Sequence, residues 1–267
     1  MQDEIQDRLR QSDVIDPARA AAGLAMLGLA AEVSPGDALP PFFHQLYFWQ
    51  ARPPAQLGRD GHPKTGGIIP DMGLPRRMWA GGALEFHAPL RAGLAAEKVT
   101  TLENSSRKQG RSGPLGFVRL RHEISQGGQL CVTEYQDLVY REDPAPGARL
   151  PTPPRAREEA LRRESRSFDS TLLFRYSALT FNGHRIHYDL DYARSVEGYD
   201  GLVVHGPLLA QMLMLMAERE LGRLGRFSFR ATAPLMHFEP AELCWGGDGN
   251  LWVRAPDGRQ NMIAEAG

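Results

Sequence analysis

Residues 172–221 read LLFRYSALTFNGHRIHYDLDYARSVEGYDGLVVHGPLLAQMLMLMAEREL and concentrate the polar chemistry of the chain. The polar side chains that stand out are Asn182, His184, His187 and His205. His205-Gly206-Pro207 then leads directly into an apolar run over residues 208–216. Because the free amides at a helix start favour negative charge, a helix that begins at Gly206 is a candidate site for a developing anion.

The expected helix, from Gly206 to about Leu221, is apolar around nearly its whole circumference. A helix of this kind must be buried rather than lie on a surface. A short strand over Leu172–Tyr176 is expected before it. After it, alternating strands are expected over residues 227–238, 242–247, 251–256 and 262–266, with turns at glycine. A helix enclosed by a curved antiparallel sheet satisfies this pattern.

The first half of the chain has the same order of elements. Asp16-Pro17 resembles a helix N-cap followed by proline, and the spacing of alanine and leucine extends the expected helix to near Val33. Residues 42–49 indicate a strand or a packed extended segment, and residues 51–82, with five prolines and seven glycines, indicate a long loop. Strands separated by glycine turns, one of them at residues 110–113, fill the region from 78 to 140.

Residues 142–166 combine proline and charge with almost no bulky apolar side chain, which is the composition of a linker. We therefore expect an N-terminal unit over residues 1–145, a linker over residues 146–168 and a C-terminal unit over residues 169–267.

Composition excludes several classes of protein. A net charge of -1 argues against a nucleic-acid partner, which requires a basic surface. The two cysteines are too few for a disulfide framework, so a reduced, cytoplasmic setting is expected, and the acidic N-terminus predicts no secretory signal. The longest apolar run, of about ten residues, is half of what a membrane span needs, so no membrane partner is expected.

Two features of the long loop concern anion binding. Residues 58–65, GRDGHPKT, invite comparison with a phosphate-binding loop, but Pro63 stands where a glycine is required and removes an amide donor. Arg76 and Arg77 are candidate contacts for an acidic ligand, although adjacent arginines are more often solvated.

The segment ALTFNGHRIH, residues 178–187, followed by VVHGPL, residues 203–208, resembles the motif of the MaoC-like hydratases and dehydratases. In that motif an acidic residue and a histidine lie five apart and a His-Gly pair opens the central helix. The longer segment SALTFNGHRIHYD, together with RRMWAGG and the GRSG turn in the first half, resembles more closely the mesaconyl-CoA and itaconyl-CoA hydratases and hydroxyacyl-thioester dehydratase type 2. The resemblance implies an α+β double hotdog fold, with two antiparallel sheets each wrapping a central helix.

The resemblance also implies catalytic roles for Asn182 and His187. Hydration of an enoyl thioester needs a base for the attacking water, a donor to the enolate oxygen and a proton for the α-carbon. Imidazole exchanges protons near neutrality, which suits His187, whereas Asn182 can hold water but cannot act as an acid or base. Asn182 occupies the position of the family's acidic residue. Because an amide cannot transfer protons, His187 is expected to handle both proton transfers. The amide of Gly206 is the expected oxyanion donor.

Further substrate contacts are expected from side chains around these three. The candidates are His184, His205, Arg185, Tyr188, Arg76 and Arg77. The two histidines could instead serve only in packing, and the arginines could be solvated cations. No organic cofactor is implied, because CoA is part of the substrate. The sequence leaves a homodimer open.

Several alternatives remain open from the sequence. A zinc site could be drawn from His184, His187, His205 and Asp189, but no thiolate is nearby and the reaction needs no Lewis acid, so no metal is expected. The acyl group is expected to be short and dicarboxylic, such as mesaconyl, itaconyl or methylfumaryl. The alternatives are an R-specific 3-hydroxyacyl-thioester dehydratase of the fatty-acid type, an acyl-CoA thioesterase, or a non-catalytic acyl-CoA binding protein.

Overall fold

The computed structural model describes residues 8–110, 113–143 and 152–267. The N-terminal half contains β1 (Arg8–Val14), α1 (Pro17–Met26), η1 (Phe43–Leu46), η2 (Pro54–Gln56), β2 (Arg76–Phe86), β3 (Ala95–Gly110), β4 (Gly113–Gln126) and β5 (Gln129–Arg141). The C-terminal half contains β6 (Arg162–Arg166), α2 (Ser170–Thr180), η3 (Arg185–His187), α3 (Leu190–Ser195), α4 (Gly206–Leu221), β7 (Arg226–Ala231), β8 (Ala241–Trp245), β9 (Asn250–Arg254) and β10 (Gln260–Ala266).

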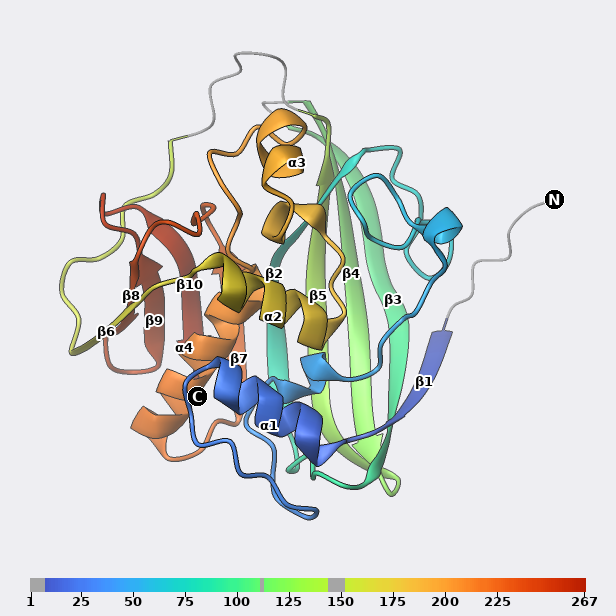
Figure 1. The fold of residues 1–267 in the computed structure, drawn as a ribbon, viewed down its shortest axis with the longest axis vertical. Helices are drawn as coiled ribbons and strands as arrows, with labels where there is room; N and C mark the ends of the chain where they lie inside the picture. The colour runs from blue at the N-terminus through green and yellow to red at the C-terminus, as the bar shows by residue number, and fades with distance from the viewer. Residues whose placement is uncertain (1–7, 111–112, 144–151) are drawn as a thin grey trace.

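All the strands belong to one antiparallel sheet in the order β1-β3-β4-β5-β2-β7-β10-β9-β8-β6. The two halves meet where β2 pairs with β7, from Gly81 opposite Arg230 to Glu85 opposite Arg226. Figure 1 shows the helices on one side of this sheet, with β1 and β6 at its two ends. The two sheets expected from the sequence are thus joined edge to edge into one.

Helix α4 has the bounds expected from the sequence. Pro207 stands in its first turn, and Gly222 ends it in the left-handed conformation at φ 77°. Leu213 and Met214 have no exposed surface, and the helix packs against β7 to β10 and against β2. The expectation that this helix is buried under a curved sheet is confirmed.

The N-terminal half differs from the C-terminal half. Helix α1 ends at Met26 rather than near Val33, because Gly28 takes a left-handed φ of 72° just after the Leu27 cap. It packs against α2 and η1, and its Gly23 lies close to the side chain of Leu46. In this half, therefore, a short helix, η1 and the long loop together cover the sheet in place of one long central helix.

Two short segments have a different structure from the one expected. Residues 42–49, expected as a strand or a packed extended segment, are buried but contain the short helix η1 over Phe43–Leu46, with Phe42 and Phe48 in the left-handed region at φ 71° and 61°. Residues 172–176 lie within α2, because the Asp169 side chain caps the helix by accepting from the Leu172 amide at 2.7 Å. A short apolar run is compatible with both helix and strand, and here the cap decides.

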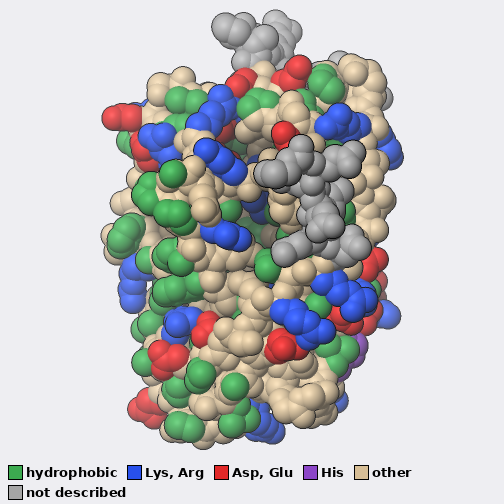
Figure 2. All heavy atoms as spheres, turned by 90° about the vertical axis from the view of Figure 1, so that its right-hand side faces the viewer, with side chains coloured by type: hydrophobic (Ala, Val, Ile, Leu, Met, Phe, Trp, Pro, Cys, Tyr) green, Lys and Arg blue, Asp and Glu red, His purple; other side chains and the backbone are tan. Residues whose placement is uncertain are grey.

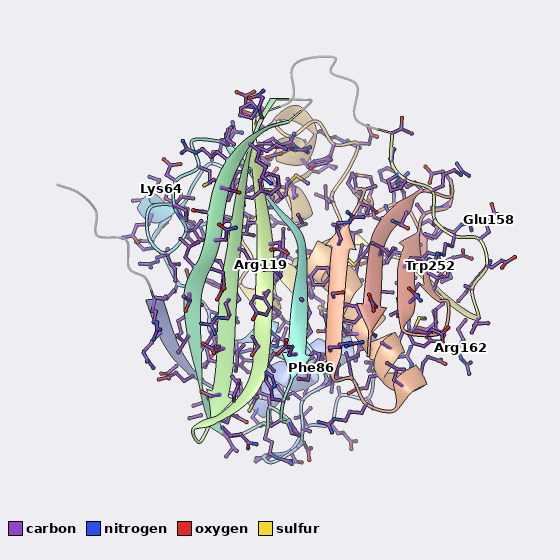
Figure 3. The ribbon with its side chains drawn as sticks, turned by 180° about the vertical axis from the view of Figure 1, so that it is seen from behind. Lys64, Phe86, Arg119, Glu158, Arg162 and Trp252 are labelled. Atoms are coloured by element: carbon purple, nitrogen blue, oxygen red, sulfur yellow. The ribbon has the colours of Figure 1, made fainter. Side chains whose placement is uncertain are left out.

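The boundary region also differs from the expected one. The long loop ends at residue 75, where β2 begins, and the last part of the expected linker is β6, which pairs with β8 at the edge of the sheet. Figure 3 shows this edge from behind, near Glu158, Arg162 and Trp252. Three predictions fall partly outside the described residues. They concern the polar N-terminus (residues 1–7), the middle of the 110–113 turn, and the first part of the linker (residues 144–151). In the described part of the chain, no helix is both long and apolar enough to cross a membrane.

Candidate active site

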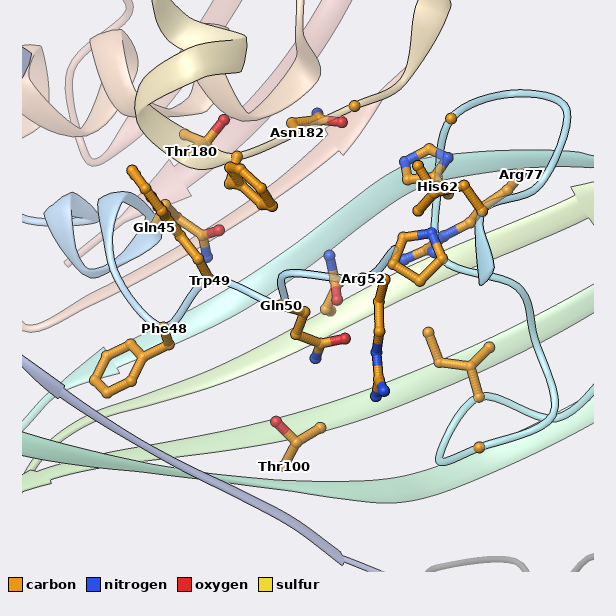
Figure 4. Close-up of a pocket in the computed structure, with 18 of the residues that line it drawn as sticks. Gln45, Phe48, Trp49, Gln50, Arg52, His62, Arg77, Thr100, Thr180 and Asn182 are labelled. Atoms are coloured by element: carbon orange, nitrogen blue, oxygen red, sulfur yellow. The ribbon is translucent and has the colours of Figure 1, made fainter. Parts of the chain in front are cut away.

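A cavity of about 770 Å³ lies between the end of α2, residues 45–69 and the inner face of β3, β4 and β5. Figure 2 shows a hollow near the middle of one face, with basic side chains around it. The charged side chains and histidines that line the cavity are Arg52, His62, Lys64, Arg77, Lys98, His122 and Glu134. In Figure 4, His62 and Arg77 lie toward one end of the cavity, Phe48 and Trp49 lie toward the other, and Asn182 lies between them, close to Thr180.

Asn182 lines the cavity directly after the last turn of α2. Phe181 ends the helix in the left-handed conformation and stacks on Trp49 at 5.1 Å between ring centroids. The backbone N–H of Asn182 donates to the Ser177 carbonyl at 2.9 Å, and its side-chain Oδ1 accepts from the backbone N–H of His184 at 3.0 Å. Its Nδ2 has no partner among the described residues, so this group is free to bind a ligand or water in the cavity.

His187 lies at the end of η3 and is turned toward the start of α4. Its Nδ1 donates to the Val203 carbonyl at 2.7 Å, which leaves Nε2 as the unprotonated nitrogen. Burial lowers the pKa of His187 to about 4, so the ring is neutral at neutral pH. The ring stacks on His205 at 3.6 Å between centroids, and His187 is 7% exposed whereas His205 has no exposed surface. His187 is therefore the more accessible member of the pair, although neither ring is part of the lining of the cavity that Asn182 faces.

His205 and His184 flank His187. The Nε2 of His205 hydrogen-bonds to the Ser177 hydroxyl at 2.9 Å, and Ser177 lines the cavity. The ring of His184 lies edge-on to His187 at 5.3 Å. Burial lowers the pKa of both flanking rings well below the ordinary value, so the cluster is uncharged. The structure thus brings together the three histidines that the sequence singled out.

Asp60 and His62 join this cluster from the long loop, and the sequence did not indicate them. The His62 Nδ1 donates to Asp60 at 2.9 Å, and the ring lies 4.5 Å from His184. Burial opposes ionisation of Asp60, but the bond from His62 keeps the pKa of the carboxyl below its ordinary value. The loop contacts the motif through Gly61 and Gly183, where a Cβ on Gly183 would lie 2.7 Å from the Gly61 carbonyl oxygen.

The zinc set left open by the sequence as an alternative is not assembled as drawn, because its three histidines lie together but Asp189 does not join them. In the described ranges, the one group of potential ligands is Asp60, His62 and His184, with ligand atoms within 4.8 Å of one another. Asp189 instead caps α3 and pairs with Arg185 at 2.7 Å. The Asp60–His62 contact has the length of an ordinary hydrogen bond, which accounts for it without a metal.

The remaining candidates have different positions relative to the cavity. Arg77 and Tyr188 line it, and the Tyr188 hydroxyl donates to the Gly183 carbonyl at 2.8 Å. Arg76 is buried and pairs with Glu197 at 2.6 Å, away from the cavity lining. Arg185 pairs with Asp189 and lies over the Tyr192 ring, also outside the lining. The opening residue of α4, Gly206, lies near the Trp79 carbonyl and is outside the lining as well.

A second polar group on the inner face of the sheet was also missed by sequence reasoning. Both oxygens of the buried Glu134 accept from Gln45, and one also contacts the His44 ring at 2.9 Å. His122 bonds to Thr100 at 2.8 Å, and burial lowers its pKa to about 4. Alternation in β4 and β5 places these residues on one face, but nothing local indicated that they face a cavity instead of solvent.

The fold is shared with proteins of known structure. A Mycobacterium tuberculosis protein described as having a double hotdog fold superposes with a TM-score of 0.61 over 98% of this chain and 95% of that one, at 16% identity. The hotdog expectation is confirmed by this likeness and by the helix-wrapping sheet. This likeness and the sheet define a protein of the double-hotdog class.

Sequence comparison identifies the family. The model of the family described as hydroxyacyl-thioester dehydratase type 2 matches residues 42–237, so the chain belongs to this family. The chain is 45% identical to the mesaconyl-C(4)-CoA hydratase of Chloroflexus aurantiacus, over 94% of this chain and 92% of that protein. It is 30% identical to the mitochondrial hydroxyacyl-thioester dehydratase type 2 of Schizosaccharomyces pombe, over 80% of each. The resemblance read from the motif is confirmed.

Proposed function

We propose that this protein adds water to a short enoyl-CoA that carries a free carboxylate, of the mesaconyl-C4 type. The observation that carries the proposal is the neutral His187, whose Nδ1 is held by the Val203 carbonyl and whose Nε2 is left as a base. The name of the Chloroflexus relative supports the acyl class. CoA enters as part of the substrate, and no other cofactor is required by the reaction.

The proposed step follows from the chemistry of these groups. His187 Nε2 takes a proton from a water held by the Asn182 amide, and the water oxygen bonds to the β-carbon. The π electrons move to the thioester as an enolate, which the free amide of Gly206 stabilises at the positive end of α4. The α-carbon then takes a proton from the His187 imidazolium, which restores the neutral ring and balances the reaction as the addition of one water.

A second candidate is dehydration of a longer 3-hydroxyacyl thioester of the fatty-acid type. The volume of about 770 Å³, with Phe48 and Trp49 at the end opposite His62, favours an acyl chain longer than the four-carbon chain of a mesaconyl group. The family description supports this reaction as well. The cytoplasmic location and the homodimer stay predictions.

The test is a panel of enoyl-CoA and 3-hydroxyacyl-CoA thioesters followed by product mass. We expect the hydrated product of mesaconyl-C4-CoA and no release of free thiol, which separates hydration from thioester cleavage. His187→Ala should lower kcat by about 1,000-fold and Asn182→Ala by about 100-fold, since proton transfer and water positioning are each lost.

His87→Ala is the matched control, because this histidine bonds to Thr133, is not part of the histidine cluster around His187, and its side chain is 37% exposed. Circular dichroism and thermal melting establish that each variant is folded. Turnover by His187→Ala within tenfold of the wild type would exclude the proposed mechanism, and exclusive turnover of long-chain hydroxyacyl thioesters would favour the second candidate.

A further inference from the structure

The two adjacent arginines at the start of β2 have different environments. Arg76 is enclosed, with its guanidinium 2.6 Å from the Glu197 carboxylate and 5.5 Å from the centroid of the Tyr199 ring. Arg77 points the other way, as alternate residues of a strand do, and lines the cavity. In the described part of the chain, Arg77 has no ion pair and no side-chain hydrogen bond. Its charge is therefore available to a ligand.

Arg77 lies at the His62 end of the cavity. Figure 4 shows its side chain next to His62, with Asn182 between this end and Trp49. Burial, and after it the charge of Arg77, lower the pKa of His62, and the same charge helps to hold the pKa of Asp60 down. The guanidinium is thus within electrostatic reach of the histidine cluster and also faces open space.

The other cations that line the cavity are less suited to bind an anion beside Asn182. The ammonium of Lys64 donates to the Ala55 carbonyl at 2.9 Å. Lys98 lies beside the Phe48 ring at 5.3 Å from its centroid, and Phe48 is at the opposite end. Arg52 is exposed and is not next to the histidines. Arg77 is therefore the lining cation that lies beside the Asp60–His62 pair and lacks a protein partner among the described residues.

The chemistry of the substrate explains why this position matters. In a four-carbon enoyl thioester with a second carboxyl group, the free carboxylate is bonded to the β-carbon, the atom that water attacks. A receptor for that carboxylate must therefore lie beside the water-holding Asn182. Guanidinium binds a carboxylate through two parallel hydrogen bonds, which fixes the orientation as well as the charge.

We propose that Arg77 binds the free carboxylate of the acyl group and so selects dicarboxylic over monocarboxylic acyl-CoA substrates. This inference rests on the proposed function for the position of the acyl group. It assigns the neighbouring arginines separate roles, with Arg77 binding substrate and Arg76 holding the segment around Glu197. The anion at Arg77 has a second source, the phosphates of CoA, and the experiment separates the two.

The test uses succinyl-CoA and butyryl-CoA, which have the same chain length and CoA but differ in the carboxylate. Neither is an enoyl thioester, so their dissociation constants, measured by calorimetry, do not depend on turnover. We expect the wild type to bind succinyl-CoA about 10- to 100-fold more tightly than butyryl-CoA, as a charge-assisted bond predicts. Arg77→Gln should remove this preference and leave the affinity for butyryl-CoA within about threefold.

Two further variants serve as controls. Arg77→Lys keeps the charge but loses the paired bonds, so it should keep part of the preference. Arg119→Gln is a matched change on the other face of the sheet, seen from behind in Figure 3, where Arg119 pairs with Asp137 at 3.5 Å. It should bind both ligands as the wild type does. Melting temperatures check that each variant is folded.

Three outcomes would overturn the inference. They are equal affinities of the wild type for the two ligands, a preference that survives in Arg77→Gln, and an equal loss for both ligands in Arg77→Gln, which would place Arg77 on the CoA moiety. A wild type that prefers succinyl-CoA but does not hydrate mesaconyl-C4-CoA would keep the inference and contradict the proposed function.

Discussion

His187 combines a hydrogen bond and a degree of burial that set its protonation state. The Val203 carbonyl selects the tautomer, and the enclosed position lowers the pKa to about 4. His205, stacked on it, has no exposed surface, so it supports the ring and does not meet a ligand directly. A residue that sequence spacing marks as catalytic is thus neutral over the whole physiological range.

The pH dependence of hydration follows from this pKa. The neutral ring is the active base, so kcat/KM should be low when His187 is protonated, rise as pH increases through about 4, and stay level from about 5.5 to 8. Steady-state kinetics in a series of buffers over this pH range measure kcat/KM at each pH. An inflection near 6.5, the ordinary histidine value, would show that the ring is not desolvated in the free enzyme.

At the scale of elements, the site depends on contacts between segments that are distant in the chain. The long loop reaches the catalytic segment where Gly61 meets Gly183, and the Arg185 amide donates to the Asp60 carbonyl at 2.9 Å. Gly61 takes a φ of 88°, which favours glycine. This contact holds His62 beside His184 and closes one end of the cavity.

Gly183→Ala tests this contact. The added Cβ would lie 2.7 Å from a backbone oxygen, which cannot move without shifting the loop. We expect a loss of about 1–3 kcal/mol in the free energy of unfolding and a decrease in kcat of about tenfold or more. Denaturant unfolding and steady-state kinetics measure the two effects.

Gly67→Ala is the control for stability, because a Cβ there has open space and its φ is not in the left-handed range. Its free energy of unfolding should stay within about 0.5 kcal/mol of the wild type. Equal stability and activity of Gly183→Ala and the wild type would show that the loop is free to move away from the motif.

At the scale of the whole molecule, the halves share one sheet and one core. The β2–β7 seam is close because Gly81 and Gly82 lie against the backbone and ring of Phe229. The main cluster of buried side chains includes Leu84 from the first half and Leu213 from the second. The halves are therefore expected to unfold together despite the linker-like composition between them.

Phe229→Ala at the seam tests this coupling. The side chain is 6% exposed, and its removal should cost about 3–5 kcal/mol. Calorimetry should show one transition that moves to lower temperature as a whole. Two separate transitions, of which only one shifts, would show that the halves are independent folding units.

Much of the fold could be read from local patterns. The apolar residues of α4 and its flanking proline and glycine define the helix, because its burial and its ends depend on neighbours three or four positions apart. Strands β4 and β5 follow from alternation for the same kind of reason. The short run 172–176 could not be assigned correctly, since its state depends on the Asp169 cap and on packing against α1.

The sequence by itself determined the family, the fold class and the spacing between Asn182 and His187. Only the tertiary structure separated Arg76 from Arg77, brought Asp60 and His62 to the histidine cluster, and placed Glu134 and His122 on the wall of a cavity. Periodicity and motif spacing report on residues that are close along the chain. These further placements depend on the register of the sheet and on contacts between distant segments, which no local pattern encodes.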